Sequence, residues 1–308
     1  MPQSNKSDPV IQDQAESLRR TRFMKSSVEQ KVMRSRTAVS RVMSFTSGKG
    51  GVGKTSMVVN TAVALARAGK SVLILDADLG LANVDVLLGL KPMATLLDVF
   101  EGRASLDEIM VEGPEGISII PAASGVESMC NLDSGRQMLL LQAVENMAPQ
   151  FDYLLIDTQA GIGSDVMYFN SAASEIVVVI TGEPTSLTDA YALIKVLSQN
   201  YGEHSFSVIS NNVRDERDGQ RAFARLHGAV AQFLQVEVRY LGYVPSDSAM
   251  QEAIRSQRSL MELFPSSKAA LAIGQISRRI DEAFLEHRVK GGMQFFFNRL
   301  LEVSASDR

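Results

Sequence analysis

Residues 47–55 carry the most specific chemical signal of the chain, Ser-Gly-Lys-Gly-Gly-Val-Gly-Lys-Thr. They follow an apolar run at residues 42–46 and precede a helical pattern that continues to Arg67. Glycines let the backbone curl until several N–H groups point at one centre, and the N-terminus of the following helix favours an anion there. We expect Lys54 to reach the β- and γ-phosphates of a nucleoside triphosphate and the Thr55 hydroxyl to bind Mg²⁺. The other residues of this predicted phosphate loop are Gly48, Gly50, Gly51, Val52, Gly53 and Ser56.

Carboxylates follow two further apolar runs. Asp76 and Asp78 lie two residues apart after the run at 72–75, and side chains at that spacing on an extended segment point the same way. Asp157 follows the run at 153–156, the pattern of a Walker B strand whose aspartate holds Mg²⁺ mostly through water. The alternative for Asp76 and Asp78 is that they cap helices, as strand-end aspartates often do.

These motifs need a scaffold that brings strand ends together. Apolar runs suited to buried strands recur at residues 42–46, 72–75, 117–121, 153–156, 176–180, 206–210 and 238–243. Helical patterns separate most of them, at residues 54–68, 133–147, 185–199, 217–234 and 267–286. The alternation predicts an α/β fold, a doubly wound, mainly parallel sheet with helices on both faces. Ligands of such sheets bind at the carboxyl ends of the strands, where the motifs lie.

Composition excludes several classes of protein. With one cysteine, Cys130, the chain has neither a disulfide framework nor the paired thiolates of an iron–sulfur or CxxC metal site. His204, His227 and His287 are scattered without metal-ligand spacing. No apolar run approaches the roughly 18 residues of a membrane span and no signal peptide is visible, so we expect a cytoplasmic protein.

The charge is divided unevenly along the chain. Residues 1–41 hold nine Lys and Arg against four Asp and Glu, whereas the remainder holds 22 against 31. An acidic body disfavours electrostatic binding to DNA, so we expect no direct DNA binding. The basic leader is suited to an acidic partner.

The second lysine of the loop, Lys49, indicates a particular group of P-loop proteins. The string Lys-Gly-Gly-Val-Gly-Lys-Thr resembles the deviant Walker A ATPases, the P-loop group that contains MinD, ParA, the arsenite-pump ATPase and nitrogenase iron protein. In that group the early lysine reaches the ATP of the other subunit. The resemblance therefore implies a homodimer that forms with ATP and Mg²⁺ and separates after hydrolysis, with slow turnover unless a partner stimulates it. It implies catalytic roles for Lys49, Lys54 and Asp78, with Asp78 acting on the attacking water and Asp76 supporting the magnesium shell.

Other parts of the family pattern are less specific. Asn83 and Asp85 belong to the first switch segment, although a local turn role is equally compatible with them. In the second switch, Gly161 and Gly163 are implied to sense the γ-phosphate, but Gln159 stands where many relatives have proline. The resemblance further implies an adenine site formed by the side chains of Asn211, Arg214, Pro245 and Asp247.

The leader carries an amphipathic pattern too short to form a stable helix alone, with Ile11, Ala15 and Leu18 on one stripe. Its string Asp-Gln-Ala-Glu-Ser-Leu-Arg at 13–19 resembles the DQAxxLR element of the flagellar MinD-like ATPases, the FlhG family, also called FleN or YlxH. There the element binds FlhF, a signal-recognition-type GTPase, and stimulates it. The alternative is an incidental amphipathic leader. The implied partner-binding residues are Asp13, Gln14, Leu18 and Arg19.

The last segment resembles the membrane-targeting helix of MinD and FlhG and follows a Gly-Gly pair at 291–292. With the exception of Phe295, its large apolar residues fall within an arc of about 140° on a helix. This pattern predicts binding to anionic lipids at the inner face of the cell membrane. The alternative is a helix packed on the protein itself. The lipid-facing residues are Met293, Phe296, Phe297, Leu300 and Leu301.

The resemblance covers the whole chain, divided into a leader (1–41), an ATPase domain (42–288) and an amphipathic tail (289–308). It implies control of flagellar number or placement, and it leaves room for basal-body or transcription-regulator clients. Three alternatives remain open: a division-site ATPase of MinD type, a DNA partition ATPase of ParA type, and a scaffold that uses nucleotide only as a clamp. The division-site alternative does not account for the leader.

Overall fold

The computed structural model describes residues 41–123, 135–136, 140, 147 and 150–286 of the chain. The predicted leader helix and the predicted membrane tail therefore lie outside the described residues. So does most of the helix expected at 133–147. Within the described residues, no helix is long and apolar enough to cross a membrane.

Eight strands form one sheet in the order β3-β4-β2-β5-β1-β6-β7-β8. All neighbouring pairs are parallel except β3 and β4, which confirms the expected doubly wound, mainly parallel architecture. The strands are β1 (Arg41–Thr46), β2 (Val72–Ala77), β3 (Val111–Glu112), β4 (Ser118–Ile120), β5 (Tyr153–Thr158), β6 (Glu175–Ile180), β7 (Ser205–Val213) and β8 (Glu237–Pro245).

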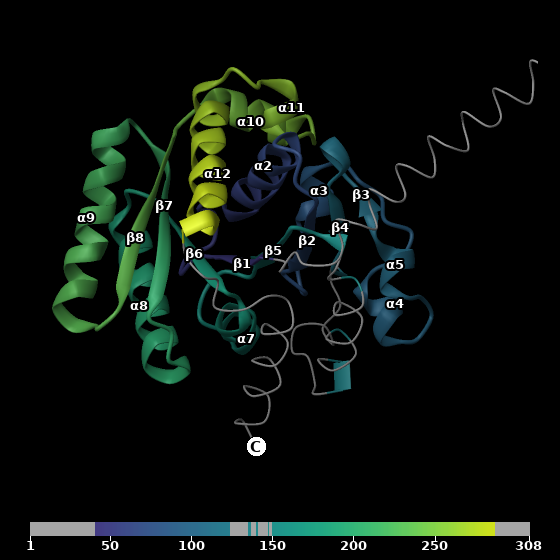
Figure 1. Cartoon of the computed structure of the whole chain (residues 1–308), viewed down its shortest axis with the longest axis horizontal. Coiled ribbons are helices and arrows are strands. Elements are labelled where there is room, and N and C mark those ends of the chain that lie inside the picture. Colours follow the sequence, from purple (N-terminus) through teal and green to yellow (C-terminus); the bar gives the residue numbers. More distant parts are fainter. Residues whose placement is uncertain (1–40, 124–134, 137–139, 141–146, 148–149, 287–308) are drawn as a thin grey trace, which may run out of the picture. The chain divides into compact units, whose positions relative to one another are not determined.

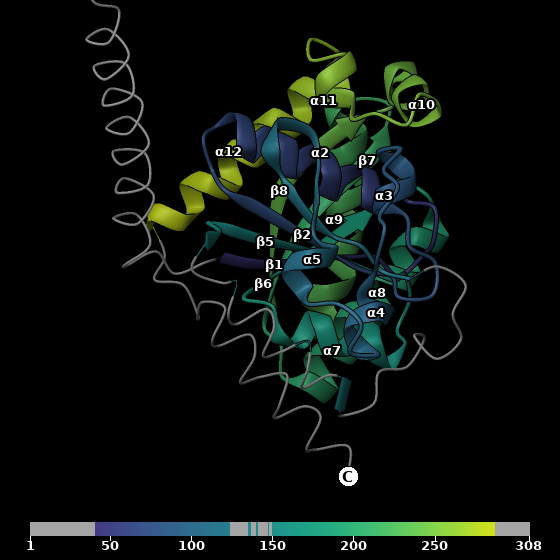
Figure 2. The ribbon, with the colours of Figure 1, turned by 90° about the vertical axis from the view of Figure 1, so that its right-hand side faces the viewer.

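Helices cover both faces of the sheet, as Figures 1 and 2 show. One face carries α2, α10, α11 and α12, and the other carries α4, α5, α7, α8 and α9. The helices are α2 (Lys54–Arg67), α3 (Val84–Leu87), α4 (Leu96–Phe100), α5 (Leu106–Ile109), α7 (Ser164–Ala172), α8 (Pro184–Tyr201), α9 (Glu216–Phe233), α10 (Ser248–Arg255), α11 (Leu260–Leu263) and α12 (Lys268–Glu286), with a short 3-10 turn η1 (Pro114–Gly116).

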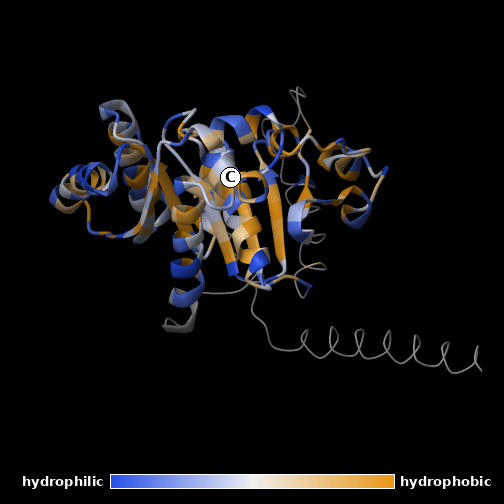
Figure 3. Ribbon diagram, turned by 90° about the horizontal axis from the view of Figure 1, so that it is seen from above, coloured by the Kyte–Doolittle hydropathy of each residue, from blue (hydrophilic) through white to orange (hydrophobic). Residues whose placement is uncertain are grey.

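Successive side chains along each strand point to opposite faces of the sheet, and each face has its own hydrophobic core. In β1, Met43 and Phe45 pack in the cluster under α2 and α12, whereas Val42 packs in the cluster on the opposite face. In β6, Val177 joins the first cluster and Val178 the other side. Both faces of each central strand are thus buried, which is why these strands read as unbroken apolar runs. Figure 3 shows the central strands coloured mostly as hydrophobic.

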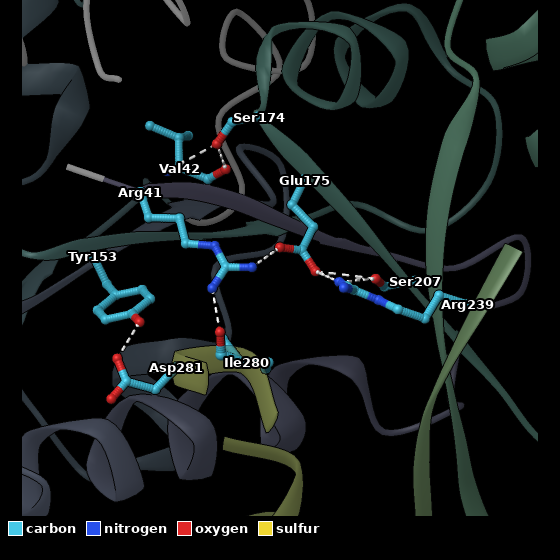
Figure 4. Close-up of polar contacts among 9 residues, drawn as sticks. All are labelled: Arg41, Val42, Tyr153, Ser174, Glu175, Ser207, Arg239, Ile280 and Asp281. Atoms are coloured by element: carbon cyan, nitrogen blue, oxygen red, sulfur yellow. Dashed lines mark hydrogen bonds and ion pairs between the residues drawn. The ribbon is translucent and has the colours of Figure 1, made fainter. Parts of the chain in front are cut away.

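Arg41 was expected in the leader but is the first residue of β1 and is buried. Its guanidinium group donates to the Glu175 carboxylate and to the Ile280 carbonyl, as Figure 4 shows. Glu175 also accepts from Arg239 at 2.9 Å and from the Ser207 hydroxyl at 3.0 Å. A buried charge with this many partners is compensated, whereas one left without its partner costs several kcal/mol, about 3 to 5. The network therefore ties the start of β1 to helix α12 at the edge where the parallel strands begin.

Candidate functional site

The phosphate loop joins the end of β1 to the start of α2, as its sequence predicts. Gly51 and Gly53 have φ angles of 78° and 86°, in the left-handed region that glycine adopts without strain. Gly53 occupies the N-cap of α2, so the first N–H groups of this helix lack side-chain acceptors. The loop therefore presents backbone donors at a helix N-terminus, which is suited to phosphate.

Gly48 is needed because helix α8 passes close to the loop. A Cβ atom at this position would lie 2.2 Å from the backbone carbonyl of Asp189 and 2.7 Å from the backbone nitrogen of Ala190. Contacts that short do not occur, and backbone atoms cannot move aside easily. The loop and the start of α8 are thus packed as one unit.

Lys54 and Asp157 form the centre of the site. The Lys54 Nζ atom lies 2.5 Å from Asp157 Oδ1, and both side chains are buried. Asp76 and Asp157 are register partners on the adjacent strands β2 and β5. The carboxyl ends of these strands therefore place two buried carboxylates beside the loop lysine, as the sequence predicts.

The two carboxylates of the first switch differ in their surroundings. Asp76 Oδ2 accepts from the N–H groups of Asn83 (3.0 Å) and Val84 (3.1 Å) at the start of α3, which is the helix-capping geometry held open as an alternative. Burial and the nearby Asp157 charge raise the pKa of Asp76 to about 7. Burial also raises the pKa of Asp78, against the attraction of Lys54.

Two oxygen atoms of this cluster lack a hydrogen-bond partner in the part of the chain that the structure describes, and the one on Asp157 fits a bound cation. Asp78 Oδ1 and Asp157 Oδ2 are buried and have no hydrogen-bond partner among the described residues, and such orphaned acceptors are rare. The same part of the chain contains no cluster of three or more His, Cys, Asp or Glu side chains that would hold a metal unaided. Mg²⁺ needs no such cage, because it is usually held by one or two carboxylates, water and the substrate phosphates. The Thr55 hydroxyl and Asp157, supported by Asp76, are the residues that would hold it.

Lys49 contacts residues that the sequence did not connect to it. Its Nζ atom lies 2.7 Å from Glu183 Oε2 and 3.0 Å from the Thr185 hydroxyl, at the N-terminus of α8. Both residues lie in the segment 182–186, which joins β6 to the start of α8. The available signal was its position directly after β6, which neighbours β1.

The predicted adenine residues gather at the carboxyl ends of β7 and β8. Asn211 is buried against the phosphate loop, where its Nδ2 atom donates to the Val52 carbonyl at 2.8 Å. Arg214 is largely exposed, and its nearest anion is Asp218 at 3.8 Å. Pro245 ends β8 opposite Val213. The adenine role of these side chains remains a prediction.

Asp247 has a structural role of its own. Its Oδ1 atom accepts from the Ala249 N–H at 3.0 Å and caps α10, and its Oδ2 atom accepts from the Ala269 N–H at 3.1 Å in α12. These backbone hydrogen bonds lower the pKa of Asp247. Both carboxylate oxygens therefore accept backbone hydrogen bonds within the protein.

The second switch is tethered to the loop. The Gly161 N–H donates to the Ser47 carbonyl at 2.8 Å, and Gly161 has a φ of 102°. Asn83, whose role was left open, precedes α3 and donates its N–H to Asp76, which is a local turn role. A γ-phosphate-sensing role for Gly161 and Gly163 stays a prediction.

Comparisons with known proteins agree with this geometry. Residues 38–281 match the model of the ParA family, described as NUBPL iron-transfer P-loop NTPase. The antiactivator FleN of Pseudomonas aeruginosa is 45% identical over 86% of this chain and 95% of its own length. The flagellum site-determining protein YlxH of Helicobacter pylori is 34% identical over 85% of this chain and 90% of its own. Among solved structures, MinD of Pyrococcus horikoshii with Mg-ADP has a TM-score of 0.67 and 28% identity, covering 81% of this chain and 99% of that one.

Proposed function

The chain belongs to the ParA family of P-loop ATPases, among the MinD-like members that include FleN and YlxH, and we propose that it regulates the number or placement of flagella through an ATP-driven cycle of dimerisation. It is an ATPase that uses ATP and Mg²⁺. Iron transfer, which the family description mentions, has no support in a chain whose single cysteine is Cys130. The observation that carries the flagellar proposal is the similarity to FleN along nearly the whole of that protein.

The site geometry supports the chemical half of the proposal. Lys54 supplies a buried positive charge beside the predicted phosphate position, and Asp78 is half-buried with one oxygen atom free to accept a hydrogen bond from water. Hydrolysis of a phosphoanhydride depends mainly on positioning and on stabilising charge. Homologues of the MinD and ParA type dimerise with ATP, and in our proposal a second copy brings Lys49 to the phosphates of its partner.

The leader supports the identity of the partner. Asp13, Gln14, Leu18 and Arg19 match the element by which flagellar MinD-like ATPases stimulate the GTPase FlhF, and we assign the same action to them here.

The leader assignment is tested by the GTPase rate of FlhF measured with three additions: the full chain, the chain lacking residues 1–25, and a peptide of residues 1–25. We expect the full chain and the peptide to stimulate and the truncated chain to have no effect. The matched control is the full chain with Asp13→Ala and Gln14→Ala, which keeps the length and should not stimulate. No stimulation by either leader-bearing form, with a partner shown to bind GTP, would leave MinD-type positioning as the better assignment.

The tail supports attachment to the inner face of the cell membrane. Burial of its five large apolar residues offers roughly 10 kcal/mol at most, which is about what ordering the segment costs, so one copy binds lipid marginally. Two tails in an ATP dimer gain from effective concentration. ATP would then control attachment.

Deleting residues 291–308 is expected to abolish sedimentation of the ATP-bound protein with vesicles that contain anionic lipids. The substitution Phe296→Asp, which keeps the tail length, should have the same effect because it places a carboxylate in the apolar face. Hydrolysis in the absence of vesicles should be unchanged. Retained vesicle binding by both variants would move the membrane site elsewhere.

A further inference from the structure

The loop lysine that distinguishes this family is held within its own chain. Lys49 Nζ donates to Glu183 at 2.7 Å and to the Thr185 hydroxyl at 3.0 Å. An ammonium group has three donors, so two of them are used by these contacts. Only one donor remains, so a full set of contacts with phosphate oxygens requires Lys49 to leave Glu183 and Thr185.

The carboxylate that accepts from Lys49 lies at a favourable position for a negative charge. Glu183 occupies the N-cap position of α8, where the positive end of the helix dipole favours a carboxylate, and Pro184 begins the helix. The loop that carries Lys49 is fixed, because Gly48 packs directly against the backbone of Asp189 in the same helix. The loop and α8 therefore cannot separate easily, and the contact opens by rotation of the Lys49 or Glu183 side chain.

We propose that Glu183 and Thr185 are positioning residues that hold Lys49 in a resting clasp, and that formation of the ATP dimer exchanges this clasp for the phosphates bound by the second copy. The inference rests on the proposed function, since it requires Lys49 to act across the dimer. Glu183 and the partner's phosphates are anions that compete for one cation. Glu183 thus sets the concentration at which the protein dimerises, and it does not take part in hydrolysis itself.

The strength of the clasp is limited by its exposure. The side chains of Lys49 and Glu183 are 39% and 64% exposed, and ion pairs of that kind are weak and sensitive to salt. Two clasps open for each dimer that forms. We therefore expect removal of both to lower the dissociation constant of the ATP dimer by about 2- to 30-fold.

The test is the dimer dissociation constant of Glu183→Gln and Thr185→Val, measured by analytical ultracentrifugation with Mg²⁺ and a non-hydrolysable ATP analogue. We expect tighter dimers from both variants, more so for Glu183→Gln, with the gain shrinking at high salt. The melting temperature should change little, because the ion pair and the helix-dipole interaction of Glu183 are both weak at an exposed position. Glu237→Gln is the matched control, since it removes the same charge from an exposed position at the opposite edge of the sheet. Hydrolysis at saturating protein should equal the wild-type rate, with half-saturation at lower protein concentration.

A double variant distinguishes the role of Glu183 from the cross-subunit role of Lys49 on which it depends. If Glu183 acts through Lys49, adding Glu183→Gln to Lys49→Ala, which is expected not to dimerise, restores no dimer. An unchanged or weaker dimer for Glu183→Gln, or a dimer restored by it in the Lys49→Ala background, would overturn the clasp. If Lys49→Ala alone dimerises as well as the wild type, it is the cross-subunit role in the proposed function that fails.

Discussion

Replacing Lys54 with methionine is expected to lower ATP hydrolysis by at least about 10²- to 10³-fold. That is the typical loss when an enzyme active site loses one preorganised hydrogen-bond donor to the charge of the transition state. Methionine keeps the length and the apolar stem of the side chain but removes the charge that lies 2.5 Å from Asp157. ATP should also bind more weakly, because the β- and γ-phosphates lose their buried cation. The measurement is phosphate release under saturating Mg²⁺ and ATP.

The same substitution should destabilise the protein. Asp157 would be left buried without its cation, and breaking a buried ion pair by removing one partner costs about 3 to 5 kcal/mol. Chemical denaturation measures that loss, and hydrolysis is then compared only under conditions where the variant is folded. Lys195→Ala, at an exposed position on α8, is the control. Hydrolysis by folded Lys54→Met within about threefold of the wild type would remove Lys54 from the site.

Replacing Lys49 with alanine is expected to prevent the ATP-dependent dimer and to lower hydrolysis by about 10³-fold or more, the scale of a cation supplied in trans to a phosphoryl group. Stability should change little, because Lys49 is partly exposed and its contact with Glu183 is weak. Nucleotide binding by the monomer should change far less than hydrolysis. Size-exclusion chromatography with ATP and a single-turnover assay check the two halves of this prediction.

The contrast between the two lysines makes these predictions independent. Lys54 is buried against its own Asp157, so its loss affects one subunit by itself, whereas loss of Lys49 affects only the assembled pair. Mixing Lys49→Ala with Lys54→Met protein should therefore restore one site of each heterodimer. The Lys49→Ala subunit keeps its own Lys54 and receives Lys49 from its partner, whereas the other site lacks both lysines. Dimerisation of Lys49→Ala at the wild-type concentration would contradict the cross-subunit role.

Much of the fold follows from local sequence, because each central strand is buried on both faces and reads as an apolar run. The expected strands at 153–156 and 176–180 correspond to β5 and β6 to within two residues at each end. The sequence did not indicate β3, which has two residues, or short helices such as α3 and α11. Elements of this length show no periodicity, and α11 is specified by a capping box between Ser259 and Glu262 instead.

Long-range contacts limited the prediction of the site. The spacing within 47–55 identifies the phosphate loop because its chemistry is local. Glu183 lies 134 residues from Lys49, and Glu175 lies 134 residues from Arg41, so neither ion pair leaves a local signal. For Asp247 the family pattern implies contact with adenine, which stays a prediction. Its carboxylate also accepts hydrogen bonds from the backbone N–H groups of Ala249 and Ala269, and the second of these, 22 residues away, leaves no local signal.

The central claim is that the hydrolytic site is complete only when two copies meet. The most direct test is the rate of ATP hydrolysis per mole of protein across a wide range of protein concentration, at saturating Mg²⁺ and ATP. We predict that this specific rate is low at dilute protein, rises as dimers form and reaches a plateau, while Lys49→Ala stays at the low value throughout. A specific rate that is independent of protein concentration, down to a range where ultracentrifugation shows only monomer, would contradict the claim.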